Sequence, residues 1–300
     1  MRTRMKRRQS LRRLEIVAVV AVVAVAVAGI YLALNTQGAN DAYIGKSVSQ
    51  KVYSLLYQAS EASYGASDSA YLTAVQSITG PLYSTNGKPI LVSATGEYCS
   101  PCALQRWPLV MALMRFGNFT NLEYMTTSVS EGDYSTFAFA ASSYTSNYVV
   151  FQPYGIYDRG GNPFETLPAN YSSANQQYGK SSVPFLDFAD DYAVSGSILP
   201  NPGLLGTRNW TQIISSIQAG DTLGGQIKQA ANVITAVICK TTGNKPASVC
   251  DNPSIVTLTD TLVSYTPPSA SSGSELLLPS ASFTMYLGTF IAEQDYRGWN

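Results

Sequence analysis

The strongest hydrophobic pattern in the chain is an uninterrupted apolar run near its N-terminus. Residues 16–34, IVAVVAVVAVAVAGIYLAL, contain no charged side chain over 19 positions. A membrane-spanning helix needs about 20 apolar residues. Seven Arg and Lys residues precede the run, and basic flanks stay in the cytoplasm. The pattern predicts a basic cytoplasmic N-terminus at residues 1–13 and a transmembrane helix at residues 14–34. We therefore expect a single-pass protein of the cell membrane whose main domain is extracellular.

A cleaved signal peptide is the main alternative for this segment. The letters AVA within it match a small-residue cleavage site. The apolar core of a signal peptide, however, spans only about 7–15 residues, which is shorter than this run. A buried core helix is the third interpretation. The length of the run favours an uncleaved anchor, and both leading interpretations export the remaining chain.

Helical spacing follows the apolar run, and strand spacing begins at residue 81. Apolar residues three or four positions apart predict a helical N-terminal extension over residues 35–80. Two short strands flank Asn86-Gly87, a dipeptide typical of tight turns. The second strand continues through Ile90–Ala94, a bounded apolar stretch typical of a buried central strand.

The helix expected next, over residues 103–117, is apolar on nearly all sides, which indicates burial in the centre of a domain. The elements expected after it are strand-like segments at 121–129, 135–142 and 147–158, a short helix at 169–179, a strand at Phe185–Phe188 with a return strand ending near Gly196, and a helix at 222–240. This order predicts an α/β domain over residues 81–252. Residues 253–300 form a Pro/Ser-rich C-terminal segment.

Composition excludes several classes of function. The chain contains no histidine, which excludes a Ser-His-Asp triad, a Cys-His protease and a His-ligated zinc or iron site. Residues 35–300 carry 12 basic and 18 acidic residues, so no basic face is expected for a nucleic acid. Charged residues make up 13% of the chain, against roughly a quarter in typical domains. A low charge content is common in extracellular and acid-exposed proteins.

The motif Cys99-Ser100-Pro101-Cys102 lies between the predicted central strand and the predicted buried helix. Amides and the dipole at a helix N-terminus stabilise a thiolate, the reactive form of cysteine. Cys99 would be the exposed nucleophile, and Cys102 would resolve the mixed disulfide. Two other interpretations remain open. The pair could be a permanently oxidised staple, or the four cysteines of the chain could bind one zinc ion.

The other two cysteines, Cys239 and Cys250, follow the last predicted helix across a loop containing Gly and Pro. A structural disulfide is the favoured interpretation in an exported domain. A second redox relay is the alternative.

Three triplets match the N-glycosylation pattern and begin at Asn118, Asn170 and Asn209. In an exported chain each of them is a candidate for modification.

The order of elements around this motif resembles the thioredoxin fold. Glu97 and Tyr98 match the acidic and aromatic residues before the first cysteine, and Pro101 matches the proline before the second. Pro184, after Val183, matches the proline that thioredoxin-like proteins keep in the cis form opposite the active site. The resemblance implies that the Val183 carbonyl is free to pair with a substrate backbone, and that Pro184 keeps metal ions away from the cysteines.

The stretches GEYCSPCALQRWPLVMALMRFGNF, SVPFLDF and ITAVICKTTGNKPASVC resemble an archaeal family of membrane-anchored thioredoxin-like proteins of unknown function. This resemblance covers most of residues 45–250 and gives a mild preference for a role of Arg106 and Trp107 beside the site. The chain departs from thioredoxin at Ser93, where thioredoxin has a buried acid. The long gap between Cys102 and Pro184 implies an inserted region of sheet and loop at about 119–180.

The expected protein is therefore a thioredoxin-like α/β domain, with a central mixed sheet flanked by helices, on one transmembrane helix. The expected function is thiol–disulfide exchange, forming or isomerising disulfides in exported proteins. Cys99 and Cys102 would be catalytic, supported by Glu97, Tyr98, Ser100, Pro101, Val183 and Pro184. The redox-active disulfide would be the sole cofactor, with no metal, and an unknown partner would exchange electrons. The alternative is a non-enzymatic binding or cell-surface module of the same fold, whose disulfides are structural.

Overall fold

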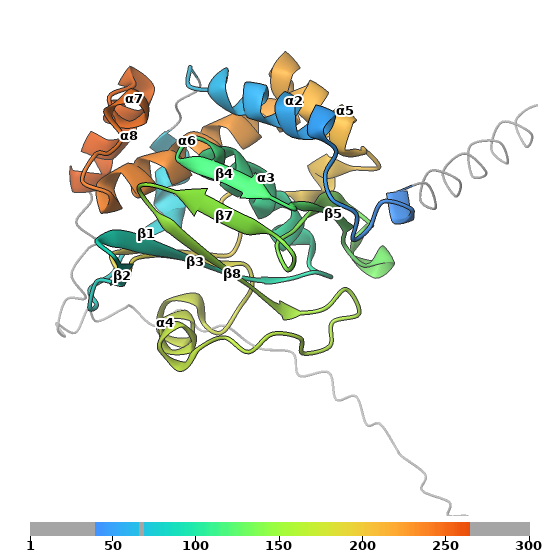
Figure 1. Ribbon diagram of the computed structural model, residues 1–300, viewed down its shortest axis with the longest axis horizontal. Coiled ribbons are helices and arrows are strands. Elements are labelled where there is room, and N and C mark those ends of the chain that lie inside the picture. Colours follow the sequence, from blue (N-terminus) through green and yellow to red (C-terminus); the bar gives the residue numbers. More distant parts are fainter. Residues whose placement is uncertain (1–39, 66–68, 265–300) are drawn as a thin grey trace, which may run out of the picture. The chain divides into compact units, whose positions relative to one another are not determined.

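The structure is a computed structural model of the 300-residue chain, and it describes residues 40–65 and 69–264 (Figure 1). The predicted cytoplasmic N-terminus and the transmembrane helix at 14–34 lie outside the described residues, and so does the segment 265–300. Within the described ranges, no helix is both long and apolar enough to span a membrane. All described residues belong to one compact unit.

A six-stranded mixed sheet forms the centre of the domain. Strand β3 is its middle strand, parallel to β8 on one side and antiparallel to β9 on the other. The order continues antiparallel from β9 to β10 and β1, and β2 pairs with the start of β3. The strands are β1 (Val75–Ser77), β2 (Ser84–Thr85), β3 (Lys88–Gly96), β8 (Val150–Tyr157), β9 (Phe185–Phe188) and β10 (Tyr192–Ser195). The expected mixed sheet flanked by helices is confirmed.

Successive side chains along each strand point to opposite faces of the sheet and so pack into two different layers. Leu91 and Phe188 belong to the large core with the α3 and α6 helices, whereas Ile90 and Val92 pack with Tyr171 of α4. Figure 1 shows α4 below the sheet and the other labelled helices above it. The helices are α2 (Gln50–Glu61), α3 (Ser100–Met114), α4 (Ala169–Gly179), α5 (Trp210–Ala219), α6 (Thr222–Thr241), α7 (Ala247–Cys250) and α8 (Pro253–Ser264).

Helix α3 is enclosed along almost its whole length, as its apolar sequence predicts. It begins at Ser100 because Cys99 caps its N-terminus, and it ends at Met114, where Arg115 is the C-cap. The Arg115 guanidinium is buried and donates to the Ser60 carbonyl on α2 and to Thr235 Oγ1 on α6. Burial lowers the pKa of Arg115 to about 10. The side chain thereby ties the end of α3 to two neighbouring helices.

Two small two-stranded sheets and three short 3₁₀ turns complete the fold within the described residues. Strand β4 pairs with β7, and β5 pairs with β6, each antiparallel. The connection from β5 to β6 contains the turn η2. The bounds are β4 (Gly117–Thr120), β5 (Glu123–Thr126), β6 (Ser135–Ala138), β7 (Ser143–Ser146), η1 (Ser69–Ala74), η2 (Val129–Glu131) and η3 (Pro202–Leu205).

The structure differs from the sequence expectation in three segments. Within the predicted insertion, 119–180, strand β8 and helix α4 belong to the main layers, so the addition reduces to the two small two-stranded sheets and their loops. Residues 69–77 form η1 and the edge strand β1 instead of continuing a helix. Residues 253–264 form helix α8, whose buried side chains Ile255, Leu258 and Leu262 join the large core. The domain therefore extends beyond residue 252.

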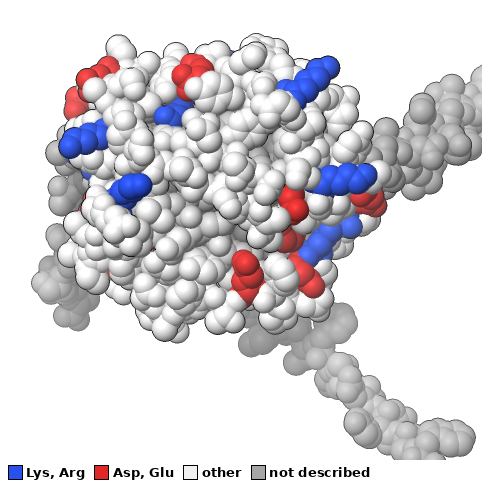
Figure 2. All heavy atoms as spheres, viewed as in Figure 1, with Lys and Arg blue, Asp and Glu red and all other residues white. Residues whose placement is uncertain are grey.

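Charged side chains are scattered over the surface. Figure 2 shows one face on which most atoms belong to uncharged residues and basic and acidic groups lie near one another. No extended field of one sign is visible on that face, in line with the low charge content of the chain.

Candidate functional site: the CSPC helix terminus

The Cys99–Cys102 pair is a disulfide at the junction of β3 and α3. The two Cα atoms are 5.2 Å apart. Cys99 has an extended backbone as the N-cap, and its Sγ accepts a hydrogen bond from the Cys102 N–H over 3.1 Å. Pro101 lies in the first helical turn, where its fixed φ suits the helix and its missing N–H costs nothing. The sequence thus places a sulfur where the helix presents its free amides.

Cys99 is less accessible than the sequence suggests, whereas the buried position of Cys102 was expected. Cys99 is 4% exposed and Cys102 is fully buried. The expected order of accessibility is present, but Cys99 is not an exposed residue. The reason is that two loops approach it. One is the loop before β9, and the other is the β5–β6 connection, whose Ser128 N–H donates to the Tyr98 carbonyl.

The loop before β9 places a backbone carbonyl opposite the disulfide. The Val183–Pro184 peptide bond is cis. The carbonyl oxygen of Val183 lies 3.9 Å from Cys99 Sγ. On the far side of Pro184, its own carbonyl accepts from the Gly196 N–H over 2.8 Å. The structure therefore brings Val183 to Cys99 although the two residues lie 84 positions apart in sequence.

Glu97 forms a buried ion pair just before the motif. Its Oε2 lies 2.8 Å from Nη1 of Arg106, a fully buried residue of α3. Arg106 also donates from Nη2 to Thr95 Oγ1 over 2.8 Å. Burial raises the pKa of Glu97, and the Arg106 charge opposes that rise. This ion pair joins the end of β3 to the second turn of α3 and so fixes the turn that carries Cys99.

The remaining predicted support residues also surround the motif. The Tyr98 ring makes an edge-on contact with Tyr157 of β8, with 5.9 Å between ring centroids. Ser100 is the first residue of α3, and its hydroxyl donates to Glu131. Trp107 is a core residue instead, fully buried and donating from its indole N–H to the Ser135 carbonyl.

Two charged residues of the site were not predicted from the sequence. Glu131 comes from η2 and reaches the first turn of α3. Arg159 donates to the carbonyls of Thr126 and Thr127 and lies 3.0 Å from an oxygen of Asp133. It thereby braces the β5–β6 connection that carries Glu131. Both contacts join residues distant in sequence, and Arg159 stands in a stretch, DRGGN, that reads only as a turn.

Thioredoxin has a buried acid at the position of Ser93 on β3. In this chain a buried acid of the sheet, Asp187, lies on β9 instead. Ser93 is buried, and its Oγ has no hydrogen-bond partner among the described residues. Asp187 on β9 is fully buried and opposite Val92, so it lies on the α4 side of the sheet. Burial raises the pKa of Asp187 to about 6, although the Asp190 N–H donates to it over 2.7 Å.

Cys239 and Cys250 form a second disulfide, at the end of α6. Their Cα atoms are 5.6 Å apart, and both residues belong to the large hydrophobic core. Across the part of the chain that the structure covers, no group of three or more His, Cys, Asp or Glu residues could hold a metal ion. Both cysteine pairs are closed as disulfides.

The three glycosylation triplets lie in different settings. Asn118 on β4 and Asn170 on α4 are exposed. Asn209 is half-buried and caps α5 by accepting from the Gln212 N–H over 3.0 Å.

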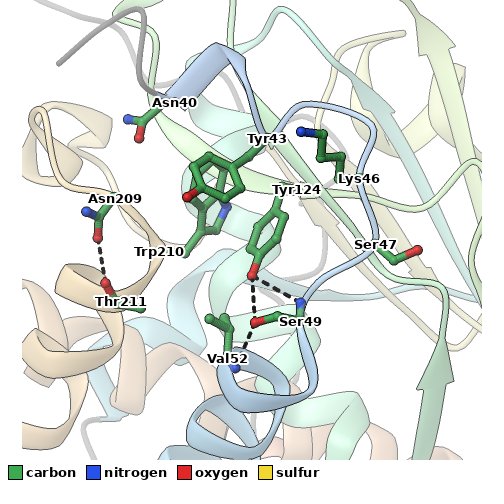
Figure 3. A pocket seen from close by; sticks show the side chains of 10 residues that line it. All are labelled: Asn40, Tyr43, Lys46, Ser47, Ser49, Val52, Tyr124, Asn209, Trp210 and Thr211. Atoms are coloured by element: carbon green, nitrogen blue, oxygen red, sulfur yellow. Dashed lines mark hydrogen bonds between the residues drawn. The ribbon is translucent and has the colours of Figure 1, made fainter. Parts of the chain in front are cut away.

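A pocket of about 490 Å³ has no cysteine in its lining (Figure 3). The rings of Tyr43, Tyr124 and Trp210 line it, and Lys46 stands at its edge. Much of its polar lining is already paired. The Tyr124 hydroxyl bonds to Ser49, and the Trp210 indole donates to the Thr136 carbonyl.

Comparison with known proteins identifies a family for the domain just described. A family described as a domain of unknown function, DUF929, matches residues 74–240, from the end of η1 to the last turn of α6. The match includes the CSPC motif and the Val183–Pro184 peptide. No curated protein and no solved structure matches the chain. Since the matched region spans more than half of the 300 residues, the chain belongs to the DUF929 family.

Proposed function

We propose that this chain is a membrane-anchored, thioredoxin-fold oxidoreductase that forms or isomerises disulfides in exported proteins. One observation carries the proposal: the Cys99–Cys102 disulfide caps a buried helix, with the carbonyl of Val183, before a cis proline, 3.9 Å from Cys99 Sγ. A helix terminus supplies donors for a thiolate, and a nearby free carbonyl supplies an acceptor for a substrate backbone.

The order of elements supports the thioredoxin fold. Strand β3 leads into the CSPC helix α3, and the chain returns as β8, parallel to β3. Helix α4 follows, then the cis proline, the β9–β10 hairpin and finally α6. This is the order of strand, CxxC helix, proline, hairpin and helix on which the sequence resemblance rests. The β5–β6 and β4–β7 strand pairs are additions to it.

The proposed reaction is the oxidation of two client thiols. A client thiolate attacks Cys99 Sγ, the Cys99–Cys102 bond breaks, and Cys102 leaves with the electron pair and takes up a proton. A second client thiol loses its proton and attacks the client sulfur of the mixed disulfide, so that Cys99 leaves as the thiolate. The client loses two electrons and two protons. A disulfide-bearing acceptor protein must then take these from Cys99 and Cys102.

The surroundings of Cys99 suit its role as the attacked sulfur and as the leaving group. The Cys102 N–H already points at Cys99 Sγ in the oxidised form, at 3.1 Å. The same donor would stabilise the Cys99 thiolate after the bond breaks. Cys102 is fully buried, where a client cannot reach it, so the attack is directed to Cys99.

A structural role for this disulfide is the second candidate. The observation that favours it is the 4% exposure of Cys99. A disulfide that clients cannot reach would only join β3 to α3, and the domain would then be a binding or cell-surface module. The two candidates differ in whether the pair reacts in the folded protein.

The test is catalysis of client oxidation by the full-length chain in detergent. The oxidised chain is mixed with a reduced peptide carrying two cysteines, and formation of the peptide disulfide is followed by mass spectrometry. We expect one peptide oxidised per chain in a fast phase, and turnover when oxidised glutathione is added. Failure to oxidise the peptide faster than glutathione alone would leave the structural candidate. Cys99→Ala is the control for reaction at the proposed sulfur.

A further inference from the structure

The carboxylate of Glu131 binds to the first turn of α3, at the residue that follows Cys99. Oε2 of Glu131 accepts a hydrogen bond from Ser100 Oγ over 2.8 Å and lies 3.4 Å from the Ser100 backbone nitrogen, which also donates to it. Ser100 is the residue directly after Cys99 and the first residue of the helix. A carboxylate is therefore bound at the helix terminus where the reduced sulfur would carry its charge.

The free amides of this terminus are shared between the carboxylate and the sulfur. Pro101 has no N–H to offer. The Ser100 N–H is used by Glu131, and the Cys102 N–H is used by Cys99 Sγ. Both acceptors are thus held at the same positive end of the helix dipole. After reduction, an ionised Cys99 would be the second anion at this terminus.

The charged groups around Glu131 do not neutralise it. Among the residues that the structure describes, Arg159 pairs with Asp133 and Asp41, and Arg106 pairs with Glu97. Glu131 has no ion-pair partner in that part of the chain. Its loop is nevertheless held in place, because Ser128 donates to the Tyr98 carbonyl and Arg159 braces Thr126 and Thr127. A negative charge bound to the residue next to Cys99 disfavours a second anion at the same helix terminus.

We propose that Glu131 is a positioning residue that controls the Cys99 nucleophile: its carboxylate, bound to Ser100 at the same helix terminus, disfavours the thiolate form of the reduced Cys99. The proposal rests on the proposed function, since it concerns the same sulfur. When the charge of Glu131 is removed by substitution with Gln, the repulsion disappears while the side-chain oxygen can still accept from Ser100. The Cys99 thiol then loses its proton to water more readily. The inserted β5–β6 connection is thereby part of the redox site.

The test is the pH profile of Cys99 alkylation in the full-length chain after reduction with dithiothreitol. Iodoacetamide reacts with the thiolate, and mass spectrometry assigns the modification to Cys99. In Glu131→Gln the acceptor oxygen remains and the charge is lost. We expect the alkylation rate at pH 6 to rise about tenfold, which corresponds to a shift of about one pH unit in the profile. Glu131→Asp should retain the wild-type profile. An unchanged profile in Glu131→Gln would overturn the proposal.

A matched control separates a specific effect from a general loss of negative charge. Glu61→Gln makes the same chemical change at an exposed position of α2, and it should leave the Cys99 profile unchanged. If Glu61→Gln and Glu131→Gln shift the profile equally, Glu131 has no particular role. Glu131→Ala tests a purely structural contribution, because a lowered stability with an unchanged profile would again overturn the proposal.

The alkylation profile also distinguishes failure of this inference from failure of the proposed function. Suppose that Glu131→Gln raises the Cys99 alkylation rate tenfold but the wild-type chain does not oxidise client peptides. That result would support the effect of Glu131 on Cys99 and reject the proposed oxidoreductase function. If the wild-type chain oxidises client peptides but Glu131→Gln leaves the Cys99 alkylation profile unchanged, the oxidoreductase function is supported and the role of Glu131 is rejected. A pair that resists dithiothreitol until the chain unfolds would reject both.

Discussion

The Cys99–Cys102 and Cys239–Cys250 disulfides are both buried, but their surroundings are opposite in polarity. The first caps the N-terminus of α3, where N–H groups and a backbone carbonyl surround it. The second lies at the C-terminal end of α6, where carbonyl oxygens accumulate and the Asn244 N–H donates to the Cys239 carbonyl over 2.7 Å. The helix dipole favours an anion at the first position and disfavours one at the second.

Exposure therefore does not distinguish the two disulfides of this domain. Cys99 is 4% exposed and Cys250 is 3% exposed. The helix end at which a sulfur lies, and the loops that meet it, separate the two pairs. We infer that the first pair is redox-active and that the second stabilises the fold.

The largest effect is expected for Cys99→Ala in the client-oxidation assay. Removal of the attacked sulfur should lower the rate by about a thousandfold, to the uncatalysed level. The double variant Cys239→Ala/Cys250→Ala should keep the rate within about threefold, since its cysteines are outside the site. Equal losses in the two variants would mean that the two disulfides do not differ in function.

The second prediction concerns stability, to which the Cys239–Cys250 disulfide should contribute more than the Cys99–Cys102 disulfide. The Cys239–Cys250 disulfide closes a loop with a sequence separation of 11, and the Cys99–Cys102 disulfide one with a separation of 3. In the chain-entropy description, the longer loop stabilises by about 3 kcal/mol and the shorter by about 2 kcal/mol. Urea unfolding of the two double-alanine variants measures the difference. A greater loss from the Cys99/Cys102 variant would contradict the division of roles.

The third prediction concerns the acid on β9, the strand that follows Pro184. Burial raises the pKa of Asp187 from 3.8 to about 6. Between these values the folded state holds a proton that the unfolded state has lost, so stability falls as pH rises through this window. Asp187→Asn should remove this fall and raise the free energy of unfolding at pH 7 by about 3 kcal/mol.

Thermal or urea unfolding at pH 4 and pH 7 measures the Asp187 effect as the difference between wild type and variant. Asp251→Asn, an exposed carboxyl beside Cys250, is the matched control and should change neither value. A variant that loses stability at pH 7 would show that the ionised carboxylate is favoured in the folded state.

The smallest effect is expected for Ser100→Ala. The variant loses the hydroxyl that donates to Glu131 but keeps the backbone N–H contact. We expect a loss of about 1 kcal/mol in the free energy of unfolding. The Cys99 alkylation profile should move in the same direction as in Glu131→Gln, by a smaller amount, because the carboxylate is held less firmly. A shift in the opposite direction would argue against repulsion between Glu131 and the thiolate.

Local signals in the sequence predicted the parts of the fold that depend on local physics. The apolar run of β3, the helix of residues 169–179 and the strand Phe185–Phe188 appear at the expected positions. Helix α5 was not predicted, although Asn209 and Gln212 form a capping box before an apolar stripe. That stretch was interpreted only as a glycosylation triplet.

The residues of the candidate site also fall into those that local sequence signals predict and those that they do not. The cysteines and Pro101 were predictable, because they stand together at a strand-to-helix junction. Glu131 lies 31 residues from Ser100 in sequence, and nothing near it signals that η2 folds back on α3. Asp187 reads as one polar residue in a short strand, and its burial depends on α4 covering that face. Contacts made by tertiary folding carry no local pattern, so the sequence could not predict them.

The most direct test of the account is the reduction potential of both disulfides in one sample of the full-length chain. The chain is equilibrated across a glutathione series, and thiol labelling with mass spectrometry reports each pair separately. We predict a potential between about −120 and −270 mV for Cys99–Cys102, and a Cys239–Cys250 pair that stays oxidised below about −300 mV. If Cys99–Cys102 also stays oxidised below about −300 mV, the pair is a structural staple and the oxidoreductase is wrong.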